Sequence, residues 1–216
     1  MPIYWLVLLN CVSMQQLSES KAMPKKVAIT GNIGCGKSWV SALFESQGIP
    51  VFYSDDEAKR LYYRPEIMAA MKQRFGDDIY LPDGLINKTL LSQIIFSDVE
   101  ARTFVEQTLY PALNRYFDEW AQEQNSPFVL YESALIFEKH LESMFDAVIL
   151  VTASEGTRLR RVMLRDHCSE EAVRARMANQ WSEADKISRA DYVIYHEYDD
   201  EDDFLFEQVE SVILEV

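Results

Sequence analysis

The chain has 216 residues, of which 48% are hydrophobic and 26% are charged, proportions typical of a globular protein rather than a disordered or fibrous one. Acidic side chains number 35 against 21 basic ones, and the resulting formal charge of -14 repels nucleic acid and anionic membranes. The three cysteines, Cys11, Cys35 and Cys168, form no C-x-x-C pair, which argues against a disulfide framework and indicates a reducing compartment. We therefore expect a cytoplasmic protein, a monomer or a weak homo-oligomer, with no nucleic-acid or membrane partner.

The first 22 residues differ from the rest of the chain. Their apolar stretch, residues 3–9, ends at Asn10 and falls short of the roughly 20 apolar residues that span a membrane. No basic region precedes it and no A-x-A-like cleavage site follows, which argues against a signal peptide. We expect residues 1–22 to be a dispensable leader and residues 23–216 to form the domain.

Strands and helices alternate from residue 25 onward. Residues 27–30 predict a buried strand, residues 38–47 a helix that Gly48 ends, and residues 49–53 a second strand. Short connections of this kind are typical of a parallel sheet. Three further strands are predicted at residues 128–131, 147–152 and 192–195. The expected fold is α/β and doubly wound, a five-stranded parallel sheet with helices on both faces.

Residues 56–125 contain no comparable strand signal and predict a helical insert. Helical segments are expected at residues 56–63, 65–75, 87–96, 98–106 and 111–123. The expected breaks are Pro65, Gly76, the Leu-Pro-Asp-Gly turn at residues 81–84, and Pro111.

Residues 31–38, Gly-Asn-Ile-Gly-Cys-Gly-Lys-Ser, match the phosphate-binding pattern G-x-x-x-x-G-K-[ST] between a predicted strand and a predicted helix. Glycines let successive backbone N–H groups face one anion, and the helix N-terminus adds partial positive charge. Lys37 is expected to reach the β/γ-phosphates, and Ser38 to offer its hydroxyl oxygen to Mg²⁺. The expected nucleotide-binding residues in this region are Asn32, Ile33, Gly34, Cys35, Gly36, Lys37, Ser38 and Trp39.

Guanine specificity is disfavoured because Asn-Lys-Thr-Leu at residues 87–90 fails the last position of the base-reading motif N-K-x-D and falls in the helical insert. The loop therefore predicts a compact small-molecule kinase that uses ATP and Mg²⁺. Cys35 is interpreted as a small residue in a variable position of the loop, and the alternative is a thiol activated by the helix N-terminus.

Asp55 and Asp56 follow the second strand. A carboxylate at the C-terminal end of a strand opens into the crevice where α/β sheets bind ligands, so Asp55 is a candidate general base for an acceptor hydroxyl. The alternative is that one of the pair caps the next helix, with Asp56 as the expected cap.

Several motifs in order resemble the dephospho-CoA kinases, which phosphorylate the ribose 3′-hydroxyl of dephospho-CoA to give coenzyme A. The resemblance covers residues 25–196. It is carried by segments 29–38, 48–51 with Ser54 and Asp55, 84–88 with Phe96, 135–138, 161–166 with Arg176 and Gln180, and 190–194. It implies that the insert at residues 56–125 binds the acceptor, dephospho-CoA, and that Asp55 is the base.

The resemblance also implies that residues 155–185 form a lid over ATP. Six of the 12 arginines lie within residues 158–176, and Arg161 and Arg165, four residues apart, share one helix face. Two guanidinium groups closing on a triphosphate stabilise its developing charge, so Arg165 is expected to be catalytic with Lys37 and Asp55, and Arg161 to bind nucleotide. The alternative is a solvated helix balanced by neighbouring acids. The acidic run at residues 197–203 is interpreted as a solvated turn.

Four residues depart from the family pattern: Asn32 replaces the second loop glycine, Tyr110 a histidine, Ala134 a proline and His196 an asparagine. Glu132 is a further candidate for a group that acts on Mg²⁺ or substrate. Two other functions stay open, a nucleoside or nucleotide kinase of the same fold and an ATP-binding regulatory module without turnover.

Overall fold

The computed structural model describes residues 23–197 and 202–216. The expected leader, residues 1–22, lies outside the described residues, and so do residues 198–201 of the acidic run.

Five parallel strands form one sheet, as predicted. They are β1 (Lys25–Thr30), β2 (Val51–Tyr53), β3 (Phe128–Glu132), β4 (Ala147–Thr152) and β5 (Tyr192–Tyr195), in the spatial order β2-β3-β1-β4-β5. Strand β1 pairs with β3 on one side and with β4 on the other. The segment after β1 therefore leaves the sheet at its centre.

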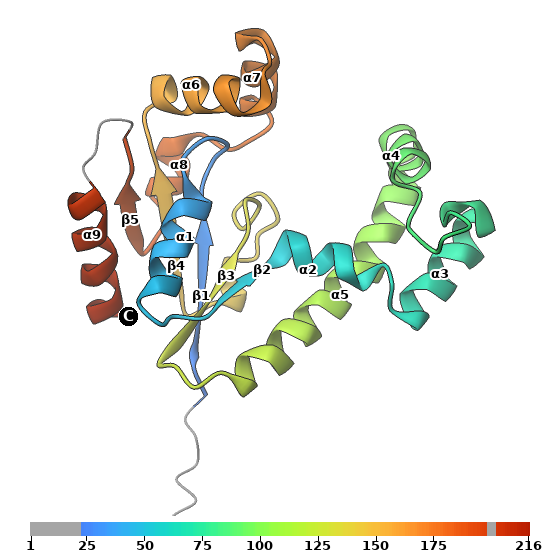
Figure 1. Ribbon diagram of the computed structural model, residues 1–216, viewed down its shortest axis with the longest axis horizontal. Coiled ribbons are helices and arrows are strands. Elements are labelled where there is room, and N and C mark those ends of the chain that lie inside the picture. The colour runs from blue at the N-terminus through green and yellow to red at the C-terminus, as the bar shows by residue number, and fades with distance from the viewer. Residues whose placement is uncertain (1–22, 198–201) are drawn as a thin grey trace, which may run out of the picture.

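Helices cover both faces of the sheet (Figure 1). On one face, α1 (Lys37–Ser46) and α9 (Asp202–Glu215) pack over Val27 and Ile29 of β1. Alternation along the strand turns Ala28 to the other face, where it joins a second cluster with Phe117. Both faces of β1 are buried, as its continuous apolar sequence predicts.

The chain between β2 and β3 is helical, except for an isolated bridge between Tyr80 and Ile86. Its elements are α2 (Ser54–Leu61), α3 (Pro65–Phe75), the 3-10 turn Asp77–Ile79, α4 (Lys88–Ser97) and α5 (Val99–Glu123). Asn87 and Asp98 cap α4 and α5 with side-chain oxygens that accept backbone N–H groups. Helices α3 and α4 extend away from the sheet in Figure 1, and α5 runs back beneath it.

The expected break at Pro111 is wrong, because α5 is one helix from Val99 to Glu123 with Pro111 inside it. Proline removes one backbone hydrogen bond and disfavours a helix interior by about 3 kcal/mol. In α5 this cost is outweighed by a continuous buried stripe that runs on both sides of the proline. The stripe consists of Ala101, Val105, Leu109, Ala112, Leu113, Phe117 and Ala121.

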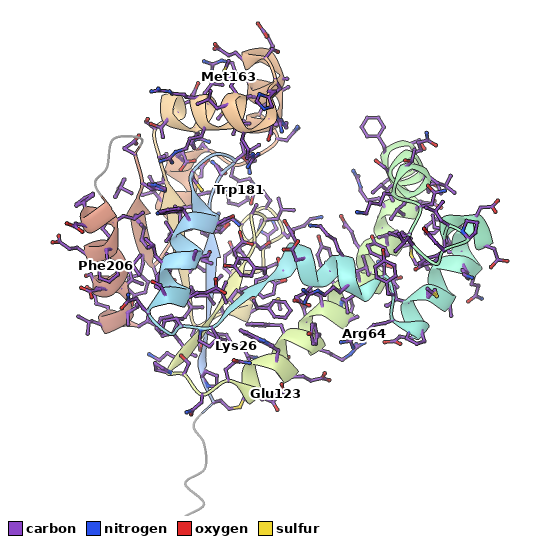
Figure 2. All side chains as sticks on the ribbon, viewed as in Figure 1. Lys26, Arg64, Glu123, Met163, Trp181 and Phe206 are labelled. Carbon is purple, nitrogen blue, oxygen red and sulfur yellow. The ribbon has the colours of Figure 1, made fainter. Side chains whose placement is uncertain are left out.

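After β4 the chain forms a helical hairpin that stands above the C-terminal ends of the strands (Figure 1). Its helices are α6 (Glu155–Asp166) and α7 (Glu170–Met177), and α8 (Glu183–Ile187) follows before β5. Figure 2 shows Met163 on this hairpin and Trp181 below it, in the segment that leads back to the sheet. Among the described residues, no helix combines the length and apolar character needed to cross a membrane.

Candidate active site

The site is built where β1, β2 and β3 end. The register pairs Ile29 of β1 and Tyr53 of β2 with Glu132 of β3, so the Glu132 carboxylate lies at the sheet edge from which residues 31–38 emerge. Asp55 is two residues beyond the end of β2. Topology therefore brings together three chemically active segments that are far apart in the sequence.

The phosphate loop, residues 31–38, adopts backbone conformations that require glycine at two positions. Gly34 and Gly36 have φ angles of +83° and +89°. A Cβ on Gly34 would lie 2.5 Å from the carbonyl oxygen of Arg158, and one on Gly36 would lie 2.1 Å from the His196 ring. Helix α1 begins directly after Gly36, so the partial positive charge of its N-terminus lies at the phosphate loop, where it favours an anion.

A cavity of about 480 Å³ lies between the phosphate loop and α6. All ten residues expected to bind nucleotide line it. They are Asn32, Ile33, Gly34, Cys35, Gly36, Lys37, Ser38 and Trp39 from the loop and α1, with Arg161 and Arg165 from α6. This phosphate cavity has the backbone donors and cationic side chains that a polyphosphate needs.

Lys37 forms a buried ion pair with Glu132; their side chains are 12% and 8% exposed. Burial lowers the pKa of Lys37 to about 8, since a charged ammonium is costly to remove from water, and the nearby Cys35 thiol and Asp55 carboxylate oppose this shift. The ion pair with Glu132 holds the Lys37 ammonium at the phosphate loop. Sequence reasoning reached Glu132 only as a further candidate, because its position at the end of β3 gave no information about its partner.

Asp55 lines a second cavity of about 220 Å³, which is walled by aromatic side chains, among them Tyr62, Tyr110 and Tyr131. Burial raises the pKa of Tyr110, so its hydroxyl stays protonated and can donate a hydrogen bond. The two cavities share a wall: Ser133 and Leu135 line the tyrosine cavity, and Ala134 between them lines the phosphate cavity. We refer to the second space as the tyrosine cavity.

The expected capping role of Asp56 is wrong. Helix α2 starts at Ser54, its N-cap is Tyr53, and no side chain makes the capping hydrogen bond. Asp56 instead pairs with Lys59 one turn further along, at an exposed position where the hydrogen bond from Lys59 lowers the pKa of Asp56. Asp55 and Asp56 thus point to different surroundings, and only Asp55 lines a cavity.

Arg161 and Arg165 both reach the phosphate cavity from α6, with different partners. Arg161 donates to the carbonyl oxygens of Cys35 and His196, at 3.3 and 2.9 Å, and so holds the loop and the end of β5 together. Arg165 is mostly exposed and pairs with Asp166, which also accepts a hydrogen bond from Arg176. Arg165 can exchange this partner for a phosphate without leaving a buried charge unpaired.

Cys35 is buried, and burial raises the pKa of its thiol to about 11, which supports the interpretation as a small packing residue. We expect iodoacetamide to alkylate the half-buried Cys168 at least about tenfold faster than Cys35, because the thiolate is the reacting form and its fraction falls tenfold per pKa unit. Peptide mass spectrometry of a time course measures both rates. Equal rates in the native protein would contradict the assignment, and unfolding the protein in urea should make the two cysteines equally reactive.

Two features of the site were not found from the sequence. Glu183 carries no motif signal, yet it accepts hydrogen bonds from Asn32 of the phosphate loop and from Thr152 of β4. His196 was noted only as a departure from the family pattern, and its ring lies against Gly36 of the loop. Only the departures from the family pattern at residues 32 and 196 pointed to this region.

The phosphate loop on the central strand of a parallel sheet, with an arginine-bearing hairpin above it and a helical insert after β2, defines a P-loop kinase. The family model for dephospho-CoA kinase matches residues 25–201. This chain therefore belongs to the dephospho-CoA kinase family.

Individual relatives agree with this assignment. Dephospho-CoA kinase from Syntrophotalea carbinolica is 37% identical over 174 residues, which cover 78% of this chain and 82% of the relative. The Listeria innocua protein of the same name is 34% identical, with 80% and 88% covered. A Thermus thermophilus crystal structure has a TM-score of 0.77 at 33% identity, covering 89% of this chain and 97% of that one. A dephospho-CoA kinase structure from Campylobacter jejuni shares the fold, with a TM-score of 0.60 at 23% identity and coverage of 90% and 98%.

Proposed function

We propose that this chain transfers the γ-phosphate of ATP to the ribose 3′-hydroxyl of dephospho-CoA, giving coenzyme A and ADP. The observation that carries the proposal is the shared wall between the phosphate cavity and the tyrosine cavity, with Asp55 lining the latter. A donor phosphate in one cavity and an acceptor hydroxyl in the other are then within reach of each other. The tyrosine cavity offers aromatic faces that suit a purine base beside the ribose.

The acceptor side assigns roles to Asp55 and two neighbours. Asp55 accepts the proton of the acceptor hydroxyl and orients it toward the phosphate. Tyr110 donates a hydrogen bond to the acceptor. Lys139, which pairs with Glu106 at 2.8 Å and lines the same cavity, provides positive charge near the anionic part of the substrate.

On the donor side the chain must neutralise and align a triphosphate. The N–H groups at the start of α1 and the Lys37 ammonium bind the β- and γ-phosphates, and charge on the transferring group strengthens these contacts as the bond breaks. Arg165 turns from Asp166 to the phosphates when the α6–α7 hairpin closes as a lid. Arg161 holds the phosphate loop in place through its hydrogen bonds to the carbonyl oxygens of Cys35 and His196.

Mg²⁺ fits the oxygen groups at this site. Ser38, which carries a hydroxyl, lines the phosphate cavity, and the Glu132 carboxylate lies beside Lys37. Mg²⁺ prefers such oxygen ligands together with phosphates and water. Among the described residues there is no cluster of three or more His, Cys, Asp or Glu that could hold a metal ion. Mg²⁺, when bound, would supply positive charge that neutralises the phosphates.

An acceptor panel tests the proposal. ADP release from ATP and Mg²⁺ should depend on dephospho-CoA, and phosphorus NMR of the product should place the new phosphate on the 3′-oxygen. Turnover with a nucleoside or nucleotide but not with dephospho-CoA would replace the assignment by the nucleoside or nucleotide kinase alternative. Tight ATP binding without turnover of any acceptor would favour the regulatory module. A cytoplasmic location, proposed from the unpaired cysteines, is consistent with these substrates.

Arg165→Ala is expected to lower kcat/KM for ATP by about tenfold or more, because one charge-assisted contact to the phosphates is lost. Binding of dephospho-CoA to the ATP-free enzyme, measured by calorimetry, should not change. Arg160→Ala is the matched control, since Arg160 is exposed on the same helix and does not line the phosphate cavity. Equal damage to both ligands, or equal effects of the two variants, would remove Arg165 from the lid.

A further inference from the structure

Asn32 occupies a loop position where the family pattern has glycine, and its side chain makes specific contacts. Its amide nitrogen donates to the carbonyl oxygen of Trp181 at 3.0 Å and to Glu183 Oε1 at 2.6 Å. Both partners only accept hydrogen bonds, so the orientation of the amide is fixed. The residue is 4% exposed, and the bond to a carboxylate is of the stronger, charge-assisted kind. A glycine here would provide neither bond.

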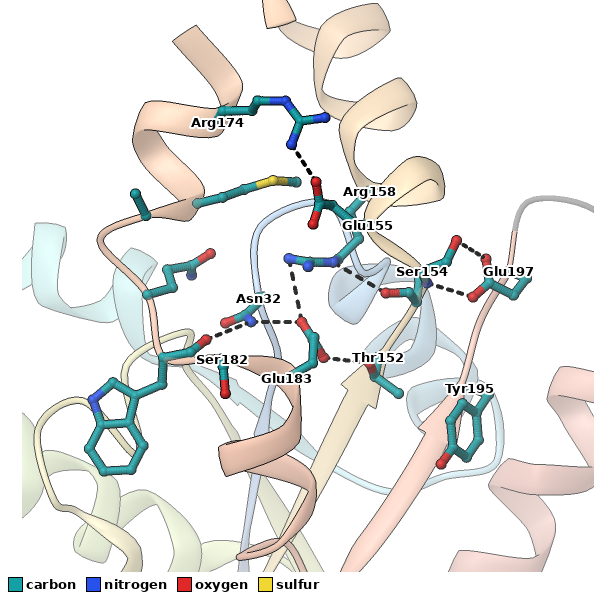
Figure 3. A pocket seen from close by; sticks show the side chains of 15 residues that line it. Asn32, Thr152, Ser154, Glu155, Arg158, Arg174, Ser182, Glu183, Tyr195 and Glu197 are labelled. Atoms are coloured by element: carbon teal, nitrogen blue, oxygen red, sulfur yellow. Dashed lines mark hydrogen bonds and ion pairs between the residues drawn. The ribbon is translucent and has the colours of Figure 1, made fainter. Parts of the chain in front are cut away.

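Glu183 collects contacts from three different segments (Figure 3). Besides Asn32, its carboxylate accepts a hydrogen bond from Thr152 at the end of β4 and pairs with Arg158 of α6 at 3.4 Å. Arg158 is buried and also donates to the carbonyl oxygen of Ala153. Glu183 is therefore satisfied by donors from the phosphate loop, from the strand that precedes the hairpin and from the first helix of the hairpin.

These contacts link the phosphate loop to the two ends of the α6–α7 hairpin. Residues 153–154 lead from β4 into α6, and residues 178–182 lead from α7 to α8, where Glu183 lies. The next residue of the phosphate loop, Ile33, also contacts the second connection, because its backbone N–H donates to Gln180 Oε1 at 2.9 Å. A cavity of about 710 Å³ lies between the hairpin and the ends of β4 and β5, and Asn32, Arg158 and Glu183 line it. The hairpin has room to tilt, and the contacts with residues 32 and 33 restrain where it pivots.

We propose that Asn32 is a positioning residue that links the phosphate loop through Glu183 to the second connection of the hairpin, residues 178–182, which acts as a hinge of the lid. We call this link the tie. Ordering the loop around a triphosphate and setting the hinge are then one event, so ATP binding depends on the tie. Chemical transfer in the closed complex does not require it. The proposal rests on the proposed function for the identity of the nucleotide and of the lid.

The test compares Asn32→Gly with a control, Asn179→Gly. Asn179 lies in the second connection, residues 178–182, and its side chain donates to the carbonyl oxygen of Ala175. Asn32→Gly should weaken ATP binding and raise KM for ATP by about tenfold, because it removes both side-chain hydrogen bonds, one of them to a charged group. The kcat at saturating ATP should stay within about twofold of that of wild type. Hydrogen exchange at residues 177–183 in the nucleotide-free protein should become faster. Asn179→Gly should leave ATP affinity unchanged.

A polarity swap separates the tie from general packing. Asn32→Asp removes the donor and places two carboxylates together, so it should impair ATP binding more than Asn32→Gly does. In the double variant Asn32→Asp/Glu183→Gln, the new amide donates to the new carboxylate. ATP affinity should then recover to within about threefold of that of Glu183→Gln alone.

Two results would overturn the proposal. The first is an Asn32→Gly variant whose ATP affinity and hydrogen exchange equal those of wild type. The second is a double variant whose fold-loss of ATP affinity equals the product of the fold-losses in Asn32→Asp and Glu183→Gln. ATP affinity by calorimetry and hydrogen exchange need no turnover. If wild-type protein fails to phosphorylate dephospho-CoA, the proposed function fails while these measurements still decide on the tie.

Discussion

Replacing Lys37 with alanine is expected to lower kcat by about 10²–10³-fold, the loss typical of removing one preorganised group that stabilises transition-state charge. The ammonium is buried at the phosphate cavity, where water screens it poorly and its contact with the phosphates is strong. Steady-state kinetics at saturating dephospho-CoA and ATP measures the effect. More than about a tenth of wild-type kcat in the purified variant would show that the loop lysine does not act on the transferred phosphate.

A folding control is needed, because Lys37→Ala leaves the buried carboxylate of Glu132 without its partner. Breaking a buried ion pair on one side costs about 3–5 kcal/mol of stability. The double variant Lys37→Met/Glu132→Gln removes both charges and keeps most of the side-chain volume, so it should melt at a higher temperature than Lys37→Ala. Its activity should remain low. Recovery of activity together with stability would assign the loss in Lys37→Ala to unfolding.

Asp55→Asn is expected to lower kcat by about 10²–10⁴-fold, because a factor of this size is the usual contribution of a general base. ATP affinity should change little. Asparagine is nearly isosteric and keeps one oxygen that can accept a hydrogen bond. It cannot take the proton of the acceptor hydroxyl or supply the negative charge that aligns it. The kinetic signature is a fall in kcat and in kcat/KM for dephospho-CoA by similar factors.

Asp56→Asn is the matched control, one residue along the same helix. Asp56 is exposed, pairs with Lys59 and lines neither cavity of the site, so kcat should stay close to that of wild type. Comparable small effects from both substitutions would show that neither carboxylate is the base. Glu132 would then be the first residue to test in its place.

The sheet could be predicted because its strands contain short apolar runs, which in β3 and β4 are buried on both faces. Residues 147–152 and 192–195 have the predicted bounds, whereas β1 begins two residues earlier than expected, at Lys25. Lys25 and Lys26 are charged and give no hydrophobic signal, but their backbones continue the pairing with Phe128 and Val129. Position in the sheet, rather than side-chain character, determined that boundary.

The site was predicted as far as local sequence carries chemistry. The phosphate loop is contiguous, so its spacing alone specifies its conformation. Contacts between distant segments could not be predicted from the sequence. Lys37 and Glu132 are 95 residues apart along the chain, and Asn32 and Glu183 are 151 residues apart. The continuity of α5 was missed for a similar reason, since proline propensity is local and the burial that outweighs it is tertiary.

Helix α5 also determines how the protein melts. One hydrophobic cluster includes Ala28 and Val148 of the sheet, Met71 and Leu91 of the insert, and Phe117 of α5. Because the insert and the sheet share this core, neither can lose its packing while the other stays intact, and heating should unfold them in a single cooperative transition. The insert and the sheet that carries the phosphate loop therefore form one thermodynamic unit, in which damage to the core of the insert lowers the thermal stability of the phosphate loop as well.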